Sequence, residues 1–73
     1  MAVDKRVAER RLQKLLKAVS WHRSAQEAYR HEGAAAGVER CERLLEIDYA
    51  HIRSHCTEHG LELPHDVPPE SAE

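Results

Sequence analysis

The stretch from Lys5 to Glu32, KRVAERRLQKLLKAVSWHRSAQEAYRHE, decides the fold. It contains neither Gly nor Pro, and most of its residues are strong helix formers. Its apolar side chains recur every three or four residues, and those that share one face are Ala8, Leu12, Leu15, Leu16 and Val19. Asp4 precedes the stretch and is a suitable N-cap. The pattern predicts an amphipathic helix over residues 5–32, about 42 Å long.

A turn and a second helix follow. Gly33 and Gly37 flank three alanines, which indicates a turn over residues 33–37, with a kinked but continuous helix as the alternative. Residues 38–59 again carry a helical apolar stripe. Gly60 stands where the residue after a helix end is expected, with Leu61 folding back on Cys56.

Residues 61–73 differ in composition from the helices. They contain three prolines and several acids, so we expect an extended or disordered tail. Its apolar side chains, Leu61, Leu63 and Val67, are placed to lie along a helix or a partner.

Two amphipathic helices joined by a short turn predict an all-α fold, an antiparallel two-helix hairpin over residues 1–60. A single hairpin leaves half of each apolar stripe exposed, so we expect two copies to pair into a four-helix bundle. The residues expected in the dimer core are Leu12, Leu15, Leu16, Val19, Val38, Cys41, Leu45, Tyr49, Ile52 and Cys56. A hairpin that completes the bundle of another protein is the alternative.

The composition narrows the class of protein. The chain has 73 residues, of which fourteen are Leu, Ile or Val and none is Phe, so a monomeric enzyme with a deep pocket is not expected. No apolar run approaches the ~20 residues of a membrane span, and the N-terminus does not resemble a secretory signal. Two cysteines are too few for a disulfide framework. We therefore expect a cytoplasmic, non-enzymatic protein with reduced thiols.

The two cysteines lie on the second apolar stripe. Cys41 and Cys56 are fifteen residues apart, about 22 Å by helical rise, so they cannot bridge to each other within one helix. We expect both to pack in the core, with a disulfide across the dimer as the alternative.

Three histidines form a row along the second helix. His51, His55 and His59 are spaced four residues apart and share one helix edge, and Asp48 lies one turn earlier. Imidazole and carboxylate ligands suit zinc or a similar divalent ion. Several histidines can also gain charge together as the pH falls. The simpler interpretation is a polar helix edge that is rich in histidine, and we therefore expect no cofactor. A site for a divalent metal at Asp48, His51, His55 and His59 is the second hypothesis.

Trp21 is the only tryptophan, and it falls opposite the leucines, together with Arg10, Lys14 and Lys17. A Trp among small and basic residues resembles an interface anchor. The alternative is a core face that rotates along the helix and brings Trp21 against the second helix. Tyr29 lies between the two faces.

Charge is divided unevenly along the chain. Residues 1–32 hold eight basic and four acidic residues, a net charge of +4, whereas residues 33–73 hold three and nine, a net charge of −6. Such a division indicates a basic binding surface, or pairing between the two halves.

The sequence therefore predicts a small protein–protein interaction module, such as an adaptor, an inhibitor or an assembly subunit. We expect it to self-associate and to present Arg10, Lys14, Lys17, Trp21 and Tyr29 to an acidic protein partner. One alternative is a metal- or pH-responsive helical regulator that uses the histidine row. Another is a nucleic-acid-binding regulator that uses the basic first helix, with affinity that falls steeply as salt rises. Membrane binding is not expected.

Overall fold

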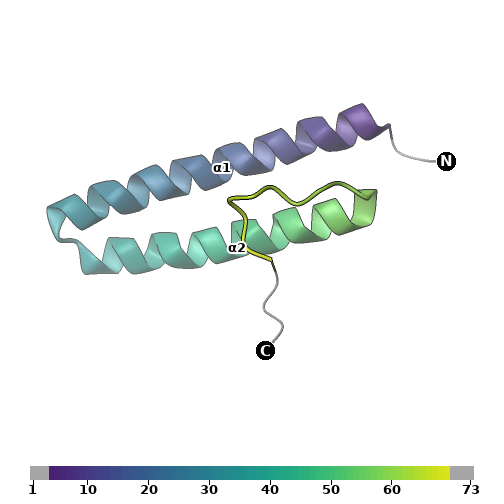
Figure 1. The fold of residues 1–73 in the computed structure, drawn as a ribbon. Coiled ribbons are helices and arrows are strands. Elements are labelled where there is room, and N and C mark those ends of the chain that lie inside the picture. The colour runs from purple at the N-terminus through teal and green to yellow at the C-terminus, as the bar shows by residue number, and fades with distance from the viewer. Residues whose placement is uncertain (1–3, 70–73) are drawn as a thin grey trace.

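The computed structural model describes residues 4–69, which form two antiparallel helices joined by a tight turn (Figure 1). Helix α1 spans Lys5–Glu32 and helix α2 spans Ala35–His59. Residues 4–69 contain no strand, so the predicted all-α hairpin is confirmed. In the same range, neither helix has an apolar stretch long enough to cross a membrane.

Both ends of α1 have local causes. At its start, Asp4 Oδ1 accepts a hydrogen bond of 3.0 Å from the amide of Arg6. At its end, Gly33 adopts the left-handed conformation with a φ of 71°. The amide of Ala34 then donates to the carbonyl of Tyr29 at 2.9 Å, as in a Schellman motif. These contacts stop α1 at the predicted residue and reverse the chain.

The turn is shorter than the predicted range of 33–37, because α2 begins at Ala35. One left-handed glycine completes the reversal, and the alanines that follow are strong helix formers that enter α2 at once. Gly37 therefore lies inside α2. A Cβ atom at Gly37 would lie 2.5 Å from Cγ of Tyr29, so this glycine serves close packing between the helices rather than the turn.

The core lies along the seam between the helices. Ile52 is completely buried, and Val19 is 2% exposed. The remaining buried apolar residues are Ala8, Leu12, Cys41, Leu45, Cys56 and Val67. The core is thus built from both helices and from one residue beyond α2.

Residues 61–69 follow an extended, non-helical path, which is one of the two predicted forms of the tail and not the disordered one. This segment returns along the hairpin from the end of α2 (Figure 1). Gly60 is left-handed, and the amide of Leu61 donates to the carbonyl of Cys56 at 2.8 Å. Val67 is 2% exposed within the core cluster, against which Leu61 and Leu63 pack. Burial of apolar side chains, each contributing about 1.5–3 kcal/mol when complete, offsets the entropy of ordering this segment. Residues 70–73 lie outside the described residues.

The residues predicted for a dimer core largely form the core of one chain. Six of the ten are buried within a single hairpin: Leu12, Val19, Cys41, Leu45, Ile52 and Cys56. The other four are half-buried: Leu15, Leu16, Val38 and Tyr49. Half of each stripe was predicted to be exposed from the two helices alone, whereas the returning segment covers part of both stripes.

Candidate functional site

The outer face of α1 carries most of the residues that the sequence assigned to a partner interface. Trp21 is 74% exposed, and Lys14 and Lys17 lie beside it around a shallow hollow of about 360 Å³. Arg10 is exposed one turn before Lys14. Within residues 4–69, none of these three cations forms an ion pair. We call Arg10, Lys14, Lys17 and Trp21 the basic face.

Tyr29 is separate from the basic face. It lies eight residues beyond Trp21, about 12 Å by helical rise, and its ring lies against Gly37 of α2. We therefore assign Tyr29 to the packing at the turn end of the hairpin. The sequence placed it between the two faces, and the close approach to Gly37 explains that ambiguous position.

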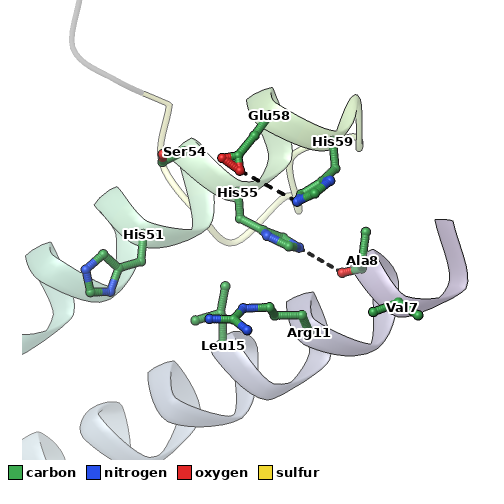
Figure 2. Close-up of a pocket in the computed structure, with 9 residues that line it drawn as sticks. All are labelled: Val7, Ala8, Arg11, Leu15, His51, Ser54, His55, Glu58 and His59. Atoms are coloured by element: carbon green, nitrogen blue, oxygen red, sulfur yellow. Dashed lines mark hydrogen bonds and ion pairs between the residues drawn. The ribbon is translucent and has the colours of Figure 1, made fainter. Parts of the chain in front are cut away.

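A second hollow, of about 530 Å³, lies between the start of α1 and the end of α2 (Figure 2). Its lining residues are Val7, Ala8, Arg11 and Leu15 from α1, with His51, Ser54, His55, Glu58 and His59 from α2. All three histidines of the predicted row thus border one space, which we call the histidine groove. The spacing of the three histidines along α2 predicts that they share one edge of the helix. That Arg11 of α1 borders the same space follows only from the way the two helices pack.

Two of the histidines have close neighbours. His55 Nε2 donates a hydrogen bond of 2.8 Å to the carbonyl oxygen of Ala8, which links the two helices. The rings of His55 and His59 lie 4.6 Å apart, and His59 Nε2 lies 3.7 Å from Glu58 Oε1. Figure 2 shows His51 standing apart from this pair. The row is therefore one bridging histidine with a neighbouring ring tilted against it at 56°, plus one separate imidazole.

The structure does not assemble the four predicted metal ligands. Asp48 turns toward α1, where its Oδ2 lies 2.5 Å from Nδ1 of His22 in a half-buried contact between the helices. Among the described residues, no group of three or more His, Cys, Asp and Glu side chains is close enough to hold a metal ion. Asp48 and His22 instead form a polar contact across the seam.

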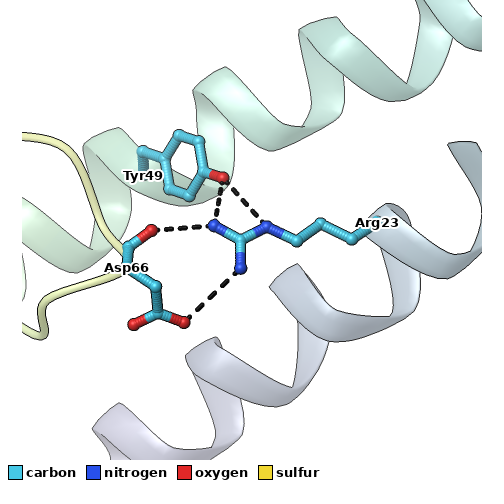
Figure 3. A network of polar contacts seen from close by, with 3 residues as sticks. All are labelled: Arg23, Tyr49 and Asp66. Atoms are coloured by element: carbon cyan, nitrogen blue, oxygen red, sulfur yellow. Dashed lines mark hydrogen bonds and ion pairs between the residues drawn. The ribbon is translucent and has the colours of Figure 1, made fainter.

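Arg23 joins three segments of the chain (Figure 3). Its Nη2 and Nε donate to the hydroxyl of Tyr49 on α2 at 2.7 and 3.2 Å. Nη2 also donates to the carbonyl of Asp66 at 2.7 Å, and Nη1 lies 3.4 Å from the Asp66 carboxylate. The hydrogen bond to Tyr49 raises the pKa of Arg23 above its ordinary value, as does the charge of Asp66, while partial burial opposes the shift. Arg23 therefore stays charged.

No pattern in the sequence predicts this role of Arg23. Asp66 is 43 residues away, in a segment expected to be extended or disordered, so no local spacing connects the two residues. Arg53 adds a second tie by donating to the carbonyl of Pro68 at 3.0 Å. The signal in the sequence for a docked tail was its three apolar residues, Leu61, Leu63 and Val67, which are more stable when buried against another surface.

Both cysteines are free thiols in the interior. Burial raises the pKa of the Cys56 thiol. Its Sγ lies 3.9 Å from the carbonyl oxygen of Glu62, so the returning segment covers it. A buried thiol with a raised pKa behaves as a small apolar side chain rather than as a nucleophile.

Comparison of the chain with protein-family models, with curated proteins and with solved structures finds no match.

Proposed function

We propose that this protein is a small, non-enzymatic protein-binding module that presents the basic face of α1 to an acidic surface on a partner protein. The observation that carries the proposal is the position of Trp21. It is the largest side chain of the sequence and is 74% exposed on a helix whose opposite face is buried.

The side chains of the basic face are suited to binding a protein. Exposed tryptophan keeps a large apolar area in contact with water, and binding to a partner removes that area. Trp and Arg dominate the energetics of protein interfaces, whereas surrounding charges steer the encounter and select the partner. Lys14 and Lys17 flank Trp21 and have no ion pair within residues 4–69. Such a surface suits a partner with clustered carboxylates around an apolar pocket.

Two features support a role without catalysis. Both thiols are buried, and the histidines border a hollow between two helices rather than an enclosed cleft. We place the module in the cytoplasm, where its thiols would stay reduced.

Self-association into a four-helix bundle is a second candidate. Val7 on α1 and Ile47 on α2 are each 52% exposed, and covering them by a second copy would bury apolar area. The half-buried residues Leu15 and Leu44 would contribute further. Sedimentation velocity over a hundredfold range of concentration tests this, since a mass of one chain throughout would exclude the bundle.

The primary proposal is tested by crosslinking in the source cells. A photoreactive phenylalanine analogue at position 21 should capture a distinct protein partner, and the same analogue at position 47 should not. The double variant Lys14→Glu/Lys17→Glu should lose that partner. The matched control is Arg40→Glu/Arg43→Glu, which changes the net charge equally but alters exposed positions on α2.

Three outcomes would contradict the proposal. They are equal capture at positions 21 and 47, equal loss in both charge variants, and capture of nucleic acid alone. The last would favour a nucleic-acid-binding regulator, whose affinity should fall steeply between low and moderate salt. Circular dichroism of each variant ensures that a lost partner does not reflect lost helices.

A further inference from the structure

Three hollows adjoin one another along α1. The histidine groove shares Val7, Arg11 and Leu15 with a third hollow of about 440 Å³, which we call the middle hollow. The middle hollow shares Lys14 with the hollow beside Trp21. Together they form a row along α1 from Val7 to His22, a length of about 22 Å by helical rise, and we call this row of hollows the trough. No residue of the returning segment 60–69 lines any of the three, so the segment leaves the trough uncovered.

We infer that this trough binds an acidic amphipathic α-helix of about four turns, laid along α1. The inference rests on the proposed function and specifies the partner's structure. It also extends the contact surface beyond the basic face, to the first turns of α1 and to the histidine groove.

The trough has an apolar floor. Val7 is 52% exposed, Leu15 and Ala18 are half-buried, and Trp21 closes the far end. These residues are spaced for a partner that presents apolar side chains every three or four residues, as an amphipathic helix does when it binds in a groove. Residues of α2 form a second wall only at the histidine groove, since the other two hollows are lined by α1 alone. The surface therefore offers side-chain ridges of helices rather than a strand edge.

The rims of the trough are basic. Arg11 and Lys14 border it from α1, and the three imidazoles border it from α2 without adding negative charge in either protonation state. Glu58 is the single carboxylate among the lining residues of the three hollows, and it lies 3.7 Å from His59 Nε2. This imbalance selects glutamate and aspartate on the partner helix and disfavours a basic helix.

The test uses the full-length chain and a designed probe. The probe is a fluorescently labelled peptide of about 16 residues with leucines spaced three and four apart and glutamates on the adjoining faces. We expect saturable binding by fluorescence anisotropy. A peptide of the same composition, shuffled so that its leucines surround the helix, should bind at least about tenfold more weakly, a difference of about 1.4 kcal/mol.

Matched variants locate the site. Val7→Glu and Arg11→Glu should each weaken probe binding about tenfold or more. Ile47→Glu and Arg43→Glu introduce glutamate in the same way at exposed positions on α2, outside the three hollows, and should change binding less than about twofold. Glu at position 7 is also favourable in the first turn of a helix, so Val7→Glu should keep the fold.

Two results overturn the inference. One is equal binding of the amphipathic and shuffled peptides, or no saturable binding of either. The other is equal binding of the probe by Val7→Glu, Arg11→Glu and the unmodified chain. If the probe fails while the crosslinked partner still depends on Lys14 and Lys17, the proposed function stands and its partner is not an acidic helix. If the probe binds the trough but no partner depends on the lysines, the proposed function fails instead.

Discussion

Arg23 of α1 donates a 2.7 Å hydrogen bond to the carbonyl oxygen of Asp66, and thereby ties the C-terminal segment to the hairpin. The same guanidinium bonds the Tyr49 hydroxyl of α2, so one side chain connects three segments. A planar group with several donors in a fixed arrangement is suited to this task, whereas a lysine ammonium is not. The docked segment in turn covers core residues of both helices, so the contact links a surface arginine to the stability of the whole fold.

Replacing Arg23 should loosen this segment. Arg23→Gln should lower the free energy of unfolding by about 1–2 kcal/mol, because two partners lose a donor while the site remains partly hydrated. Arg23→Lys should recover less than half of the loss. The midpoint of urea unfolding, followed by circular dichroism, measures both. A stability equal to that of the unmodified chain in Arg23→Gln would show that the tie contributes nothing.

Val67 should matter as a core residue although it lies outside both helices. Val67→Ala removes two methyl groups from a position that is 2% exposed and should cost about 2 kcal/mol. Val7→Ala makes the same chemical change at a position that is 52% exposed and should shift stability by less than about 0.5 kcal/mol. Equal effects of the two substitutions would mean that the segment does not dock in solution.

The sequence predicted the helices well because their signals are local. The bounds of α1 follow from Asp4 and Gly33, which act within one turn of their neighbours. The end of α2 at Gly60 follows in the same way. The predicted start of α2 is three residues late because glycine at position 37 is typical of a turn. In the structure, Gly37 lies within α2, and it leaves room for the ring of Tyr29 from α1.

The candidate site was predicted only in part, and for a comparable reason. Helical periodicity placed Trp21 on the outer face and the three histidines on one edge. It did not predict that Asp48 contacts His22 or that Arg11 lies across from the histidines, because both contacts depend on the register of the two helices. The sequence placed Val67 along a helix or a partner but could not choose between them, because its docking depends on a chain reversal followed by an extended run, for which periodicity has no signal.

A substitution at Gly37 compares two opposing effects on stability, namely the gain in helix propensity and the loss of close packing between the helices. Gly37→Ala should gain up to about 1 kcal/mol from propensity. The added Cβ, however, would lie 2.5 Å from Tyr29 Cγ and would displace the ring or separate the helices. We expect net destabilisation of about 1 kcal/mol, since overpacking typically costs more than the propensity gain. In the background Tyr29→Ala, the same substitution should become stabilising. The absence of that sign change in a double-mutant cycle would contradict the packing role of Gly37.

Cys56 reports on the docked segment through its accessibility. In the native protein it should react slowly with a thiol reagent, because the segment covers it. Arg23→Gln and Val67→Ala should accelerate its labelling several-fold. Cys41 is also buried but does not belong to the core cluster that contains Val67, so its rate should change less. Mass spectrometry after trypsin digestion separates the two sites, and parallel acceleration of both would indicate global unfolding instead.

The raised pKa of Cys56 also makes stability depend on alkaline pH. Burial keeps the folded thiol protonated at pH values where the unfolded thiol, with an ordinary pKa of 9.0, is already ionised. The favourable contribution of the neutral thiol is therefore complete below about pH 9 and is lost as the pH rises from the unfolded toward the folded pKa. We expect the unmodified chain to lose more stability between pH 7 and pH 10 than Cys56→Ala, in which this group is absent. Urea unfolding of both proteins at the two pH values measures the difference, because every other titratable group is present in both. An identical pH dependence would mean that the thiol is hydrated in the native protein, and hence that the segment bearing Glu62 does not shield it.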